Sequence, residues 1–393
     1  MKAFADRLGR LGTETAFEVL ARARALEAKG RDIVHLEIGE PDFDTPSHIR
    51  QAAKDALDHG CTHYTPSAGI DEIRRACAEH IAETRHLPYT PDHVVVVPGG
   101  KPILFYVILA LVNEGDEVVY PDPGYPIYES VARFAGGVPV PLPLREERGF
   151  HLDPDEVAEL VTPRTKLIII NSPGNPCGGV MGRADLEAVA EAALRHDCFV
   201  LSDEIYSRIL YEGEHVSIAS LPGMKERTIL LDGFSKTYAM TGWRLGYGVM
   251  STRLAPWITR LMTNSNSCCA TFTQLAGVAA LRGDQAEVGR MVEEFRARRD
   301  ELVNGLNAIP GVSCCKPQGA FYAFPSIRSL GRPAKEVAAA LLEEAGVATL
   351  AGTAFGRHGE GYLRLSYANS IENLREAVRR IRAAVEQLAE VDR

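Results

Sequence analysis

The stretch CFVLSDEIY, residues 198–206, joins a short apolar run to an abrupt series of polar and charged side chains. A run as short and apolar as Phe199–Asp203 is typical of a buried β-strand. The stretch TILLDGFSK, residues 228–236, repeats the pattern, with an apolar run that ends at Asp232 and a lysine, Lys236, soon after. A carboxylate at the end of such a strand is costly unless it has a partner. The two stretches therefore predict a buried sheet with functional groups at one edge.

Outward from these stretches, the middle of the chain alternates between strand and helix patterns. Apolar runs predict strands at His93–Val97, Glu117–Tyr120, Leu167–Asn171, Phe199–Asp203, Ile229–Asp232 and Leu245–Val249. Amphipathic stretches predict intervening helices, among them Pro102–Val112, Ala184–Arg195 and Ser251–Thr263. This alternation favours an α/β fold with a mostly parallel sheet covered by helices on both faces.

The two ends of the chain have a different pattern. Residues 285–306 predict a long charged helix, and short strands near 319–325 and 361–366 alternate with helices at 333–345 and 371–388. The first 40 residues predict one helix and one strand, too little for a core of their own. We therefore expect a large domain over residues 45–290 and a small α+β domain built from residues 1–44 and 291–393.

Composition excludes several classes of protein. The chain has 393 residues, 46% of them hydrophobic and 24% charged, as in globular proteins. No run of about 18 apolar residues predicts a membrane span, and the net charge of −9 argues against non-specific binding of nucleic acid. The N-terminal 20 residues have no apolar signal segment, so we expect a cytoplasmic protein.

The cysteines and histidines have no metal-binding spacing. The eight cysteines form no CxxC motif, and the eleven histidines form neither HExxH nor HxH. We predict no metal site and reduced thiols.

Polar residues follow several of the predicted strands, where ligands of open α/β sheets bind. These residues include Asn175, Asp203, Tyr206 and Lys236. A lysine alone at such a position would be interpreted as a solvated loop charge. An amine, a buried carboxylate and two hydrogen-bonding groups together suit pyridoxal phosphate, which needs an amine for a Schiff base and a carboxylate facing its pyridine nitrogen.

A phosphate site is predicted at Gly99, Gly100 and Lys101, before an expected helix. Free N–H groups at the start of a helix bind phosphate. Two adjacent glycines are equally well explained as an ordinary turn between a strand and a helix. Arg244, soon after Lys236, would add a fork of donors.

Several segments, taken together, resemble the class I aminotransferases of fold type I, in the branch that contains the bacterial aspartate aminotransferases. They are GEPDFDTP (39–46), NSPGNPCGG (171–179), SDEIYSRILYEGEH (202–215), SKTYAMTGWRLGY (235–247) and LRLSYANSIENL (363–374). The resemblance implies a large domain with a mostly parallel seven-stranded sheet sandwiched by helices, plus a small α+β domain from both termini. It also implies pyridoxal phosphate, amino acid and 2-oxo acid substrates, and a homodimer with active sites at the subunit interface.

The resemblance further implies a catalytic role for three residues. Lys236 matches the Schiff-base lysine, which moves a proton between the substrate Cα and the cofactor. Asp203 matches the carboxylate that keeps the pyridine nitrogen protonated. Tyr206 matches a residue that, with Asn175, contacts the phenolic oxygen of the cofactor.

The remaining implied contacts surround the cofactor and the substrate. Tyr125 matches the aromatic ring stacked on the pyridine, and Tyr64 matches a tyrosine that reaches the phosphate of the partner subunit. Arg364 matches the arginine that binds the substrate α-carboxylate, beside Asn175, and Gly39 lies in the loop that covers it. The phosphate contacts implied are Gly99, Gly100, Lys101, Ser235 and Arg244.

Some positions depart from the family pattern. Cys177 replaces a threonine, which removes a loop hydrogen bond. Gly233 stands where many members have a phosphate-binding serine, so either Ser235 or backbone amides take over that contact, or the cofactor is held less tightly. We interpret Cys268 and Cys269 as packing residues in a segment that lines the dimer interface.

Two residues leave the substrate open. Lys101 matches a lysine that reaches the distal carboxylate of aspartate, which favours aspartate with 2-oxoglutarate as acceptor; alternatively, its side chain points to solvent. Glu14 would disfavour a dicarboxylate if it faced the pocket, and would then favour a basic amino acid such as arginine. Aromatic or branched amino acids remain open as substrates too.

Other classes of protein are compatible with part of the pattern. A lyase, a synthase or an oxidase on the same fold would use the same Lys236, Asp203 and Arg364. A regulator with an aminotransferase-like domain would need a DNA-binding domain before it, and the domain here begins within the first dozen residues.

Overall fold

The computed structural model describes residues 4–391. The helices of this range are α1 (Thr15–Glu27), α2 (Ser47–Asp58), α3 (Asp71–Arg85), α4 (Lys101–Leu111), α5 (Ile127–Ala135), α6 (Pro154–Leu160), α7 (Arg183–Arg195), α8 (Ala255–Asn266), α9 (Thr271–Arg282), α10 (Ala286–Asn307), α11 (Ala334–Glu343) and α12 (Ile371–Val391). The strands are β1 (Val34–His35), β2 (Val94–Val97), β3 (Glu117–Asp122), β4 (Val138–Pro143), β5 (Thr165–Asn171), β6 (Phe199–Asp203), β7 (Thr228–Gly233), β8 (Gly246–Val249), β9 (Tyr322–Ala323), β10 (Val347–Ala348), β11 (Leu350–Ala351) and β12 (Leu363–Ser366).

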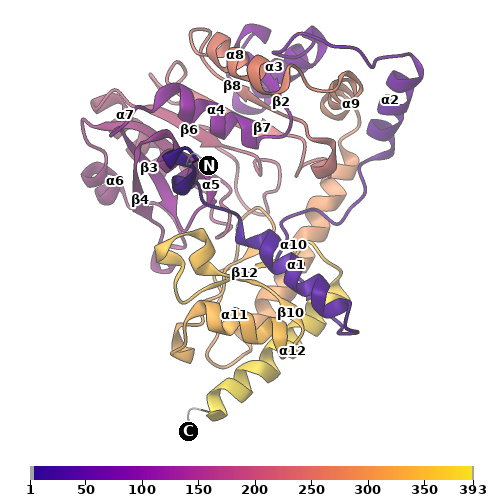
Figure 1. Cartoon of the computed structure of the whole chain (residues 1–393), viewed down its shortest axis with the longest axis vertical. Coiled ribbons are helices and arrows are strands. Elements are labelled where there is room, and N and C mark those ends of the chain that lie inside the picture. Colours follow the sequence, from indigo (N-terminus) through magenta and orange to yellow (C-terminus); the bar gives the residue numbers. More distant parts are fainter. Residues whose placement is uncertain (1–3, 392–393) are drawn as a thin grey trace.

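Seven strands form the central sheet, in the order β2-β8-β7-β6-β5-β3-β4. β8 is antiparallel to β2 and to β7, and the other neighbours are parallel. Figure 1 shows this sheet in the upper part of the molecule, with α11 and α12 below it. The predicted α/β fold with a mostly parallel sheet is confirmed.

Neighbouring side chains of the central strands enter different cores. In β5, Leu167 and Ile169 pack into a core that also holds residues of α3, α4 and α8. Ile168 and Ile170 pack into another core, with residues of α6 and α7. Successive side chains of a strand point to opposite faces, so helices on both faces require apolar residues at every position. This explains why the central strands are continuous apolar runs.

β4 is the strand that the apolar pattern does not reveal. Its prolines at 139, 141 and 143 have no N–H to donate to a neighbouring strand. β4 lies at the edge of the sheet and pairs with β3 alone. On the alternate positions, Val138 N–H donates to Asp116 O (2.8 Å) and Leu144 N–H to Asp122 O (2.9 Å). The prolines therefore occupy the positions that face away from β3, where a strand tolerates them.

Both ends of the chain contribute to another core. Val34 and Leu36 pack there with residues of α10, α11 and α12. β1 pairs in parallel with β10, and β12 lies between β11 and β9 in an antiparallel sheet. α10 joins the two parts, since Val288 packs with the central sheet and Phe295 with the second core. The domain limits at residues 45–290, with 1–44 and 291–393, stay a prediction.

The sheet register places polar residues side by side. Asn171 at the end of β5 lies opposite Asp203 at the end of β6, and Asp203 lies opposite Leu231 in β7. Parallel strands end at the same edge of a sheet. The segment that follows β7 therefore brings Lys236 to the edge that already holds Asp203.

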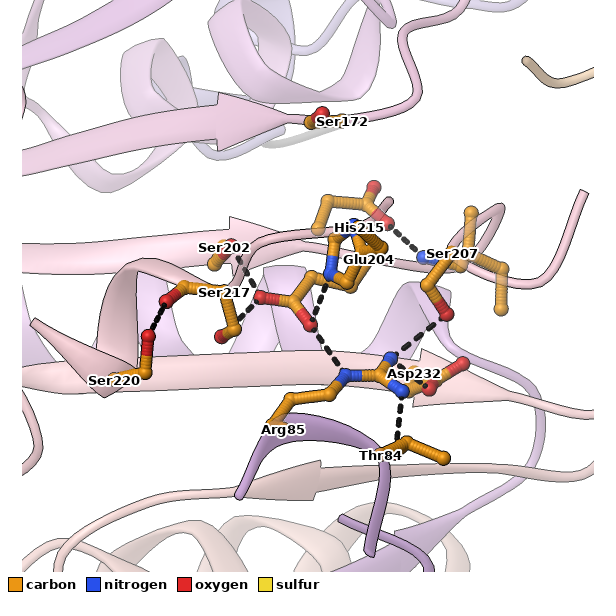
Figure 2. A network of polar contacts seen from close by, with 12 residues as sticks. Thr84, Arg85, Ser172, Ser202, Glu204, Ser207, His215, Ser217, Ser220 and Asp232 are labelled. Carbon is orange, nitrogen blue, oxygen red and sulfur yellow. Dashed lines mark hydrogen bonds and ion pairs between the residues drawn. The ribbon is translucent and has the colours of Figure 1, made fainter. Parts of the chain in front are cut away.

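A buried network of charged side chains lies beneath this edge (Figure 2). The guanidinium of Arg85, the last residue of α3, donates to Glu204 (3.0 Å), Ser207 (2.7 Å) and Asp232 (2.8 Å). Glu204 directly follows Asp203 in the chain. Asp232 lies in β7, shortly before Lys236. The network therefore ties together the two strands that carry Asp203 and Lys236.

Glu204 remains ionised inside this network. Burial by itself would raise its pKa, but His215, at 2.9 Å from the carboxylate, Arg85 and Ser217 lower the pKa to about 2. Burial raises the pKa of Asp232, and Arg85 opposes that rise. Arg85 is thus the cation that compensates two buried carboxylates.

Within residues 4–391, we find no helix long and apolar enough to cross a membrane. The same range contains no group of three or more histidine, cysteine, aspartate or glutamate side chains arranged to hold a metal ion. All eight cysteines are free thiols.

Replacing Arg85 with methionine would remove the guanidinium that Glu204 and Asp232 share and would leave His215 as the remaining basic partner of Glu204. Breaking a buried ion pair in this way costs about 3–5 kcal/mol. We expect Arg85→Met to lower the free energy of unfolding by that amount, measured by urea titration with circular dichroism. Arg75→Met is the matched control, because Arg75 lies on the same helix and 54% of its side chain is exposed; its effect should stay within about 0.5 kcal/mol. Equal losses in both variants would contradict a stabilising role of the network.

Candidate active site

A cavity of about 530 Å³ opens at the carboxyl ends of β5, β6 and β7. Its volume lies within the range of small-molecule sites, about 300–1,000 Å³. The predicted site residues that line it are Gly39, Gly100, Lys101, Tyr125, Asn175, Asp203, Tyr206, Ser235, Lys236, Arg244 and Arg364. Gly99 and Tyr64 are not among the lining residues. Gly99 directly precedes the lining residue Gly100, whereas Tyr64 is 89% exposed.

Lys236 projects into this cavity from the turn after β7. Its Nζ donates a hydrogen bond to the carbonyl oxygen of Gly39 (2.5 Å). Burial lowers the pKa of Lys236 to about 8, although the carboxylate of Glu40 opposes that shift. The neutral, nucleophilic form of this amine is therefore far more populated near neutral pH than that of an ordinary lysine.

Asp203 is a buried carboxylate at the floor of the cavity, at the end of β6. It is buried, and burial raises its pKa to about 6. The hydroxyl of Tyr128 donates to its Oδ2 (2.8 Å) and the N–H of Ile205 to its Oδ1 (3.3 Å), and both bonds oppose that rise. Asp203 is therefore ionised at neutral pH and can hold a proton on a basic nitrogen next to it.

Two tyrosines from distant segments meet beside Asp203. The hydroxyls of Tyr206 and Tyr322 lie 2.8 Å apart. Burial raises the pKa of Tyr206 well above its ordinary value. Tyr206 is therefore protonated and can donate a hydrogen bond to an oxygen in the cavity.

Arg364, on β12, is a buried guanidinium that lacks a full set of partners. It donates to Asn175 Oδ1 (3.4 Å) and to the carbonyl oxygen of Glu37, and its plane lies over the ring of Tyr322 (4.6 Å). Its Nε is buried without a hydrogen-bond partner. An unpaired buried donor costs about 1–3 kcal/mol. A guanidinium with free donors in a cavity favours a carboxylate ligand.

Gly39 occupies a position where no larger residue fits. A Cβ on this glycine would lie 2.1 Å from the hydroxyl oxygen of Tyr322. The loop at Gly39 can therefore approach both Tyr322 and Lys236 only because it has no side chain.

The start of α4 and Arg244 form a site for an anion. Gly99 has φ +86°, and a Cβ there would lie 2.2 Å from a guanidinium nitrogen of Arg244. The first N–H groups of a helix have no partner inside the helix and point at such a ligand. Arg244 is held in place by a hydrogen bond from Nη1 to Thr241 O (2.6 Å).

The structure explains the glycine at position 233. A Cβ there would lie 3.1 Å from the Cα of Gly246 on the paired strand β8. A serine would crowd that strand. Ser235, which lines the cavity, is the nearby hydroxyl that can contact an anion instead.

Lys101 and Glu14 meet on one wall of the cavity. The ammonium of Lys101 forms an ion pair with Glu14 Oε1. The same oxygen accepts a hydrogen bond from the hydroxyl of Tyr125 (3.0 Å). Glu14 therefore faces the cavity, which is the arrangement that the sequence left open.

Comparison with known proteins gives the family. The profile of the class I and II aminotransferases matches residues 31–381. The chain belongs to this family. The predicted resemblance is confirmed, and the protein is a pyridoxal-phosphate-dependent aminotransferase of fold type I.

Relatives of this aminotransferase match it over nearly its whole length. A probable aspartate/prephenate aminotransferase of Aquifex aeolicus is 42% identical, over 98% of this chain and 100% of its own. An aromatic-amino-acid aminotransferase 2 of Thermococcus litoralis is 40% identical, over 98% and 99%. A solved structure of Thermus thermophilus aspartate aminotransferase with maleate has a TM-score of 0.94, 40% identity, and coverage of 98% and 100%.

The cavity of this aminotransferase fits pyridoxal phosphate. Lys236 offers an amine, and Asp203 a carboxylate for the pyridine nitrogen. The anion site at Gly99 and Arg244 is suited to the phosphate. When bound, the cofactor supplies an aldehyde for the amino group and a ring that delocalises the electrons left on the substrate Cα.

Sequence reasoning missed two tyrosines of this aminotransferase site. Tyr128 lies in the first turn of α5, three residues after Tyr125, which precedes the helix, so their closeness in sequence could have indicated that both reach the same wall. Tyr322 lies in the apolar segment GAFYAFP and has the pattern of a core residue. Only its contacts with Tyr206 and Arg364 place it in the site.

The amine of Lys236 should titrate near pH 8 in the cofactor-free aminotransferase. Burial in the cavity disfavours its charged form, whereas an ordinary lysine titrates near 10.4. The measurement is a carbon-13 NMR titration of protein whose lysines have been reductively methylated, and Lys236→Ala identifies the signal. A midpoint near 10 would contradict the burial of this amine.

Proposed function

We propose that this aminotransferase transfers the amino group of L-aspartate to 2-oxoglutarate in two half-reactions that share one cavity. The observation that carries the proposal is the pair of cationic side chains that line that cavity, Arg364 and, on another wall, Lys101. A dicarboxylate offers one carboxylate to each of them. The relatives named for aspartate support the same substrate.

The catalytic steps divide among a few residues. With the cofactor bound, the amine of Lys236 would hold it and, once released, would move the proton from the substrate Cα. Its lowered pKa suits a general base at neutral pH. Asp203 holds a proton on the pyridine nitrogen, which keeps the ring electron-poor while the proton leaves Cα.

Other residues orient the reactants. Arg364 binds the substrate α-carboxylate next to Asn175, beneath the loop of Gly39. Tyr206 and Asn175 would donate to the phenolic oxygen of the cofactor, and Tyr125 would cover its ring. The anion site of Gly99, Gly100, Lys101, Ser235 and Arg244 binds the phosphate.

We further propose a cytoplasmic homodimer. Tyr64 is 89% exposed, far more than expected for a tyrosine with no partner surface. Cys268 and Cys269 line a second, open cavity that also contacts Arg244. A second copy of the chain over this surface would bury Tyr64 near the phosphate site of its partner.

An aromatic or other apolar amino acid is the second candidate substrate. The cavity wall also contains Phe17 and Leu104, and one relative is named for aromatic amino acids. A lyase, synthase or oxidase activity would use the same Lys236 and is separated from transamination by its products.

Adding L-aspartate without a 2-oxo acid should convert the visible absorption band of the cofactor-loaded protein and release one oxaloacetate per active site. Adding 2-oxoglutarate should then restore the band and release glutamate. Lys236→Ala is the control, and we expect its turnover to be undetectable. Release of ammonia without an acceptor would indicate a lyase. Conversion by phenylalanine but not by aspartate would refute the proposed substrate.

Replacing Lys101 with alanine should raise KM for aspartate about tenfold or more relative to KM for alanine. The reason is that only aspartate has a distal carboxylate, and the loss of one charge-assisted contact corresponds to about 1.5–3 kcal/mol. Steady-state kinetics with both amino acids tests this. An equal rise for both substrates would show that the Lys101 side chain does not bind the distal group.

A further inference from the structure

Glu14 already forms an ion pair with the ammonium group of Lys101. The distal carboxylate of a dicarboxylic substrate would bind the same group. Glu14 Oε1 pairs with Lys101 Nζ and accepts the hydroxyl of Tyr125. The Glu14 side chain is 25% exposed and that of Lys101 is 43% exposed, so both groups are partly removed from water. An ion pair in this setting is screened less than one on an open surface.

The pair connects two separate parts of the molecule at one wall of the cavity. Glu14 directly precedes α1, whose Ala23 packs with Ile33, Leu342 and Ala348 of the lower part in Figure 1. Lys101 is the first residue of α4, which packs in the core of the central sheet. Glu14 is therefore positioned by a helix that does not belong to the sheet on which Lys101 stands.

We propose that Glu14 is a specificity-determining residue, a built-in carboxylate that competes with the distal carboxylate of the substrate for Lys101. This inference rests on the proposed function, because it concerns the same substrate cavity. A dicarboxylate can reach Lys101 only by displacing Glu14 or by accepting a second negative charge next to it. Either event weakens the binding of aspartate and 2-oxoglutarate.

When Glu14 and Lys101 are paired, the cavity favours substrates with uncharged side chains. The Glu14–Lys101 pair has no net charge, and Ala16, Phe17 and Leu104 lie on the same cavity lining. A neutral apolar side chain leaves the pair intact and contacts these residues. A basic side chain would meet Lys101 as well as Glu14, so the pair gives it no net attraction. Glu14 thus widens the enzyme's substrate range from dicarboxylates toward neutral amino acids.

The test compares Glu14→Gln with the wild type, both loaded with cofactor. Glutamine keeps the shape of the side chain and removes its charge. We measure kcat/KM for the first half-reaction with aspartate and with alanine, and the Kd of the non-reactive dicarboxylate maleate from the visible absorption of the cofactor. We expect the aspartate-to-alanine ratio to rise about tenfold and maleate to bind about tenfold tighter, which corresponds to about 1.4 kcal/mol.

Glu18→Gln is the matched control. Glu18 lies on the same helix, is exposed and does not line the cavity, so this change removes one negative charge without touching Lys101. We expect both readouts of Glu18→Gln to match the wild type. Equal shifts in both variants would mean that overall charge causes the effect, and would overturn the proposal.

The remaining outcomes separate this inference from the proposed function. If aspartate and alanine both react and Glu14→Gln leaves the ratio and the maleate Kd within twofold, the role of Glu14 is refuted while aspartate transamination stands. A fall in the ratio also refutes it, since Glu14 would then orient Lys101 toward the substrate. If alanine reacts but aspartate reacts in no variant, the proposed aspartate function fails, and the inference fails with it.

Discussion

The ionised carboxylate of Asp203, held at the end of a buried strand, is the interaction on which the site depends. Burial pushes its pKa up to about 6, and the hydrogen bonds from Tyr128 and Ile205 keep it from rising further. The register of β5 against β6 sets its position next to Asn171. The paired strands of the sheet therefore fix the position of the Asp203 carboxylate in the cavity.

The positive groups around that charge come from every part of the chain. Lys236 follows β7, Lys101 begins α4, and Arg364 belongs to β12 near the C-terminus. Arg364 stays in the cavity with an unpaired buried Nε, an arrangement that costs stability unless a ligand supplies an acceptor. Beneath the cavity, the network around Arg85 compensates the buried carboxylates of Glu204 and Asp232.

Sequence reasoning succeeded where a local pattern has a single physical cause. The apolar runs of β5, β6 and β7 are continuous because helices cover both faces of the sheet, and the polar residues at their ends meet in one cavity. Sequence reasoning failed to predict β4, because the prolines of this segment argue against a strand. A strand tolerates them here only because β4 lies at the edge of the sheet. Sequence reasoning also failed for Tyr322 and Arg85, since nothing in their local sequence distinguishes a site or network residue from an ordinary one.

The cavity wall formed by Glu14 and Lys101 shows what the sequence determines and what only the tertiary structure determines. By itself, the sequence determined the α/β fold, the family, and the lysine, aspartate and arginine that the chemistry needs, because these depend on short patterns and on residue identity. The tertiary structure alone decided that Glu14 meets Lys101, because Glu14 precedes α1 and Lys101 begins α4, and folding brings these two segments together. An ion pair needs two charges within a few ångströms of each other in space. The separation of Glu14 and Lys101 along the chain does not reveal that they are this close.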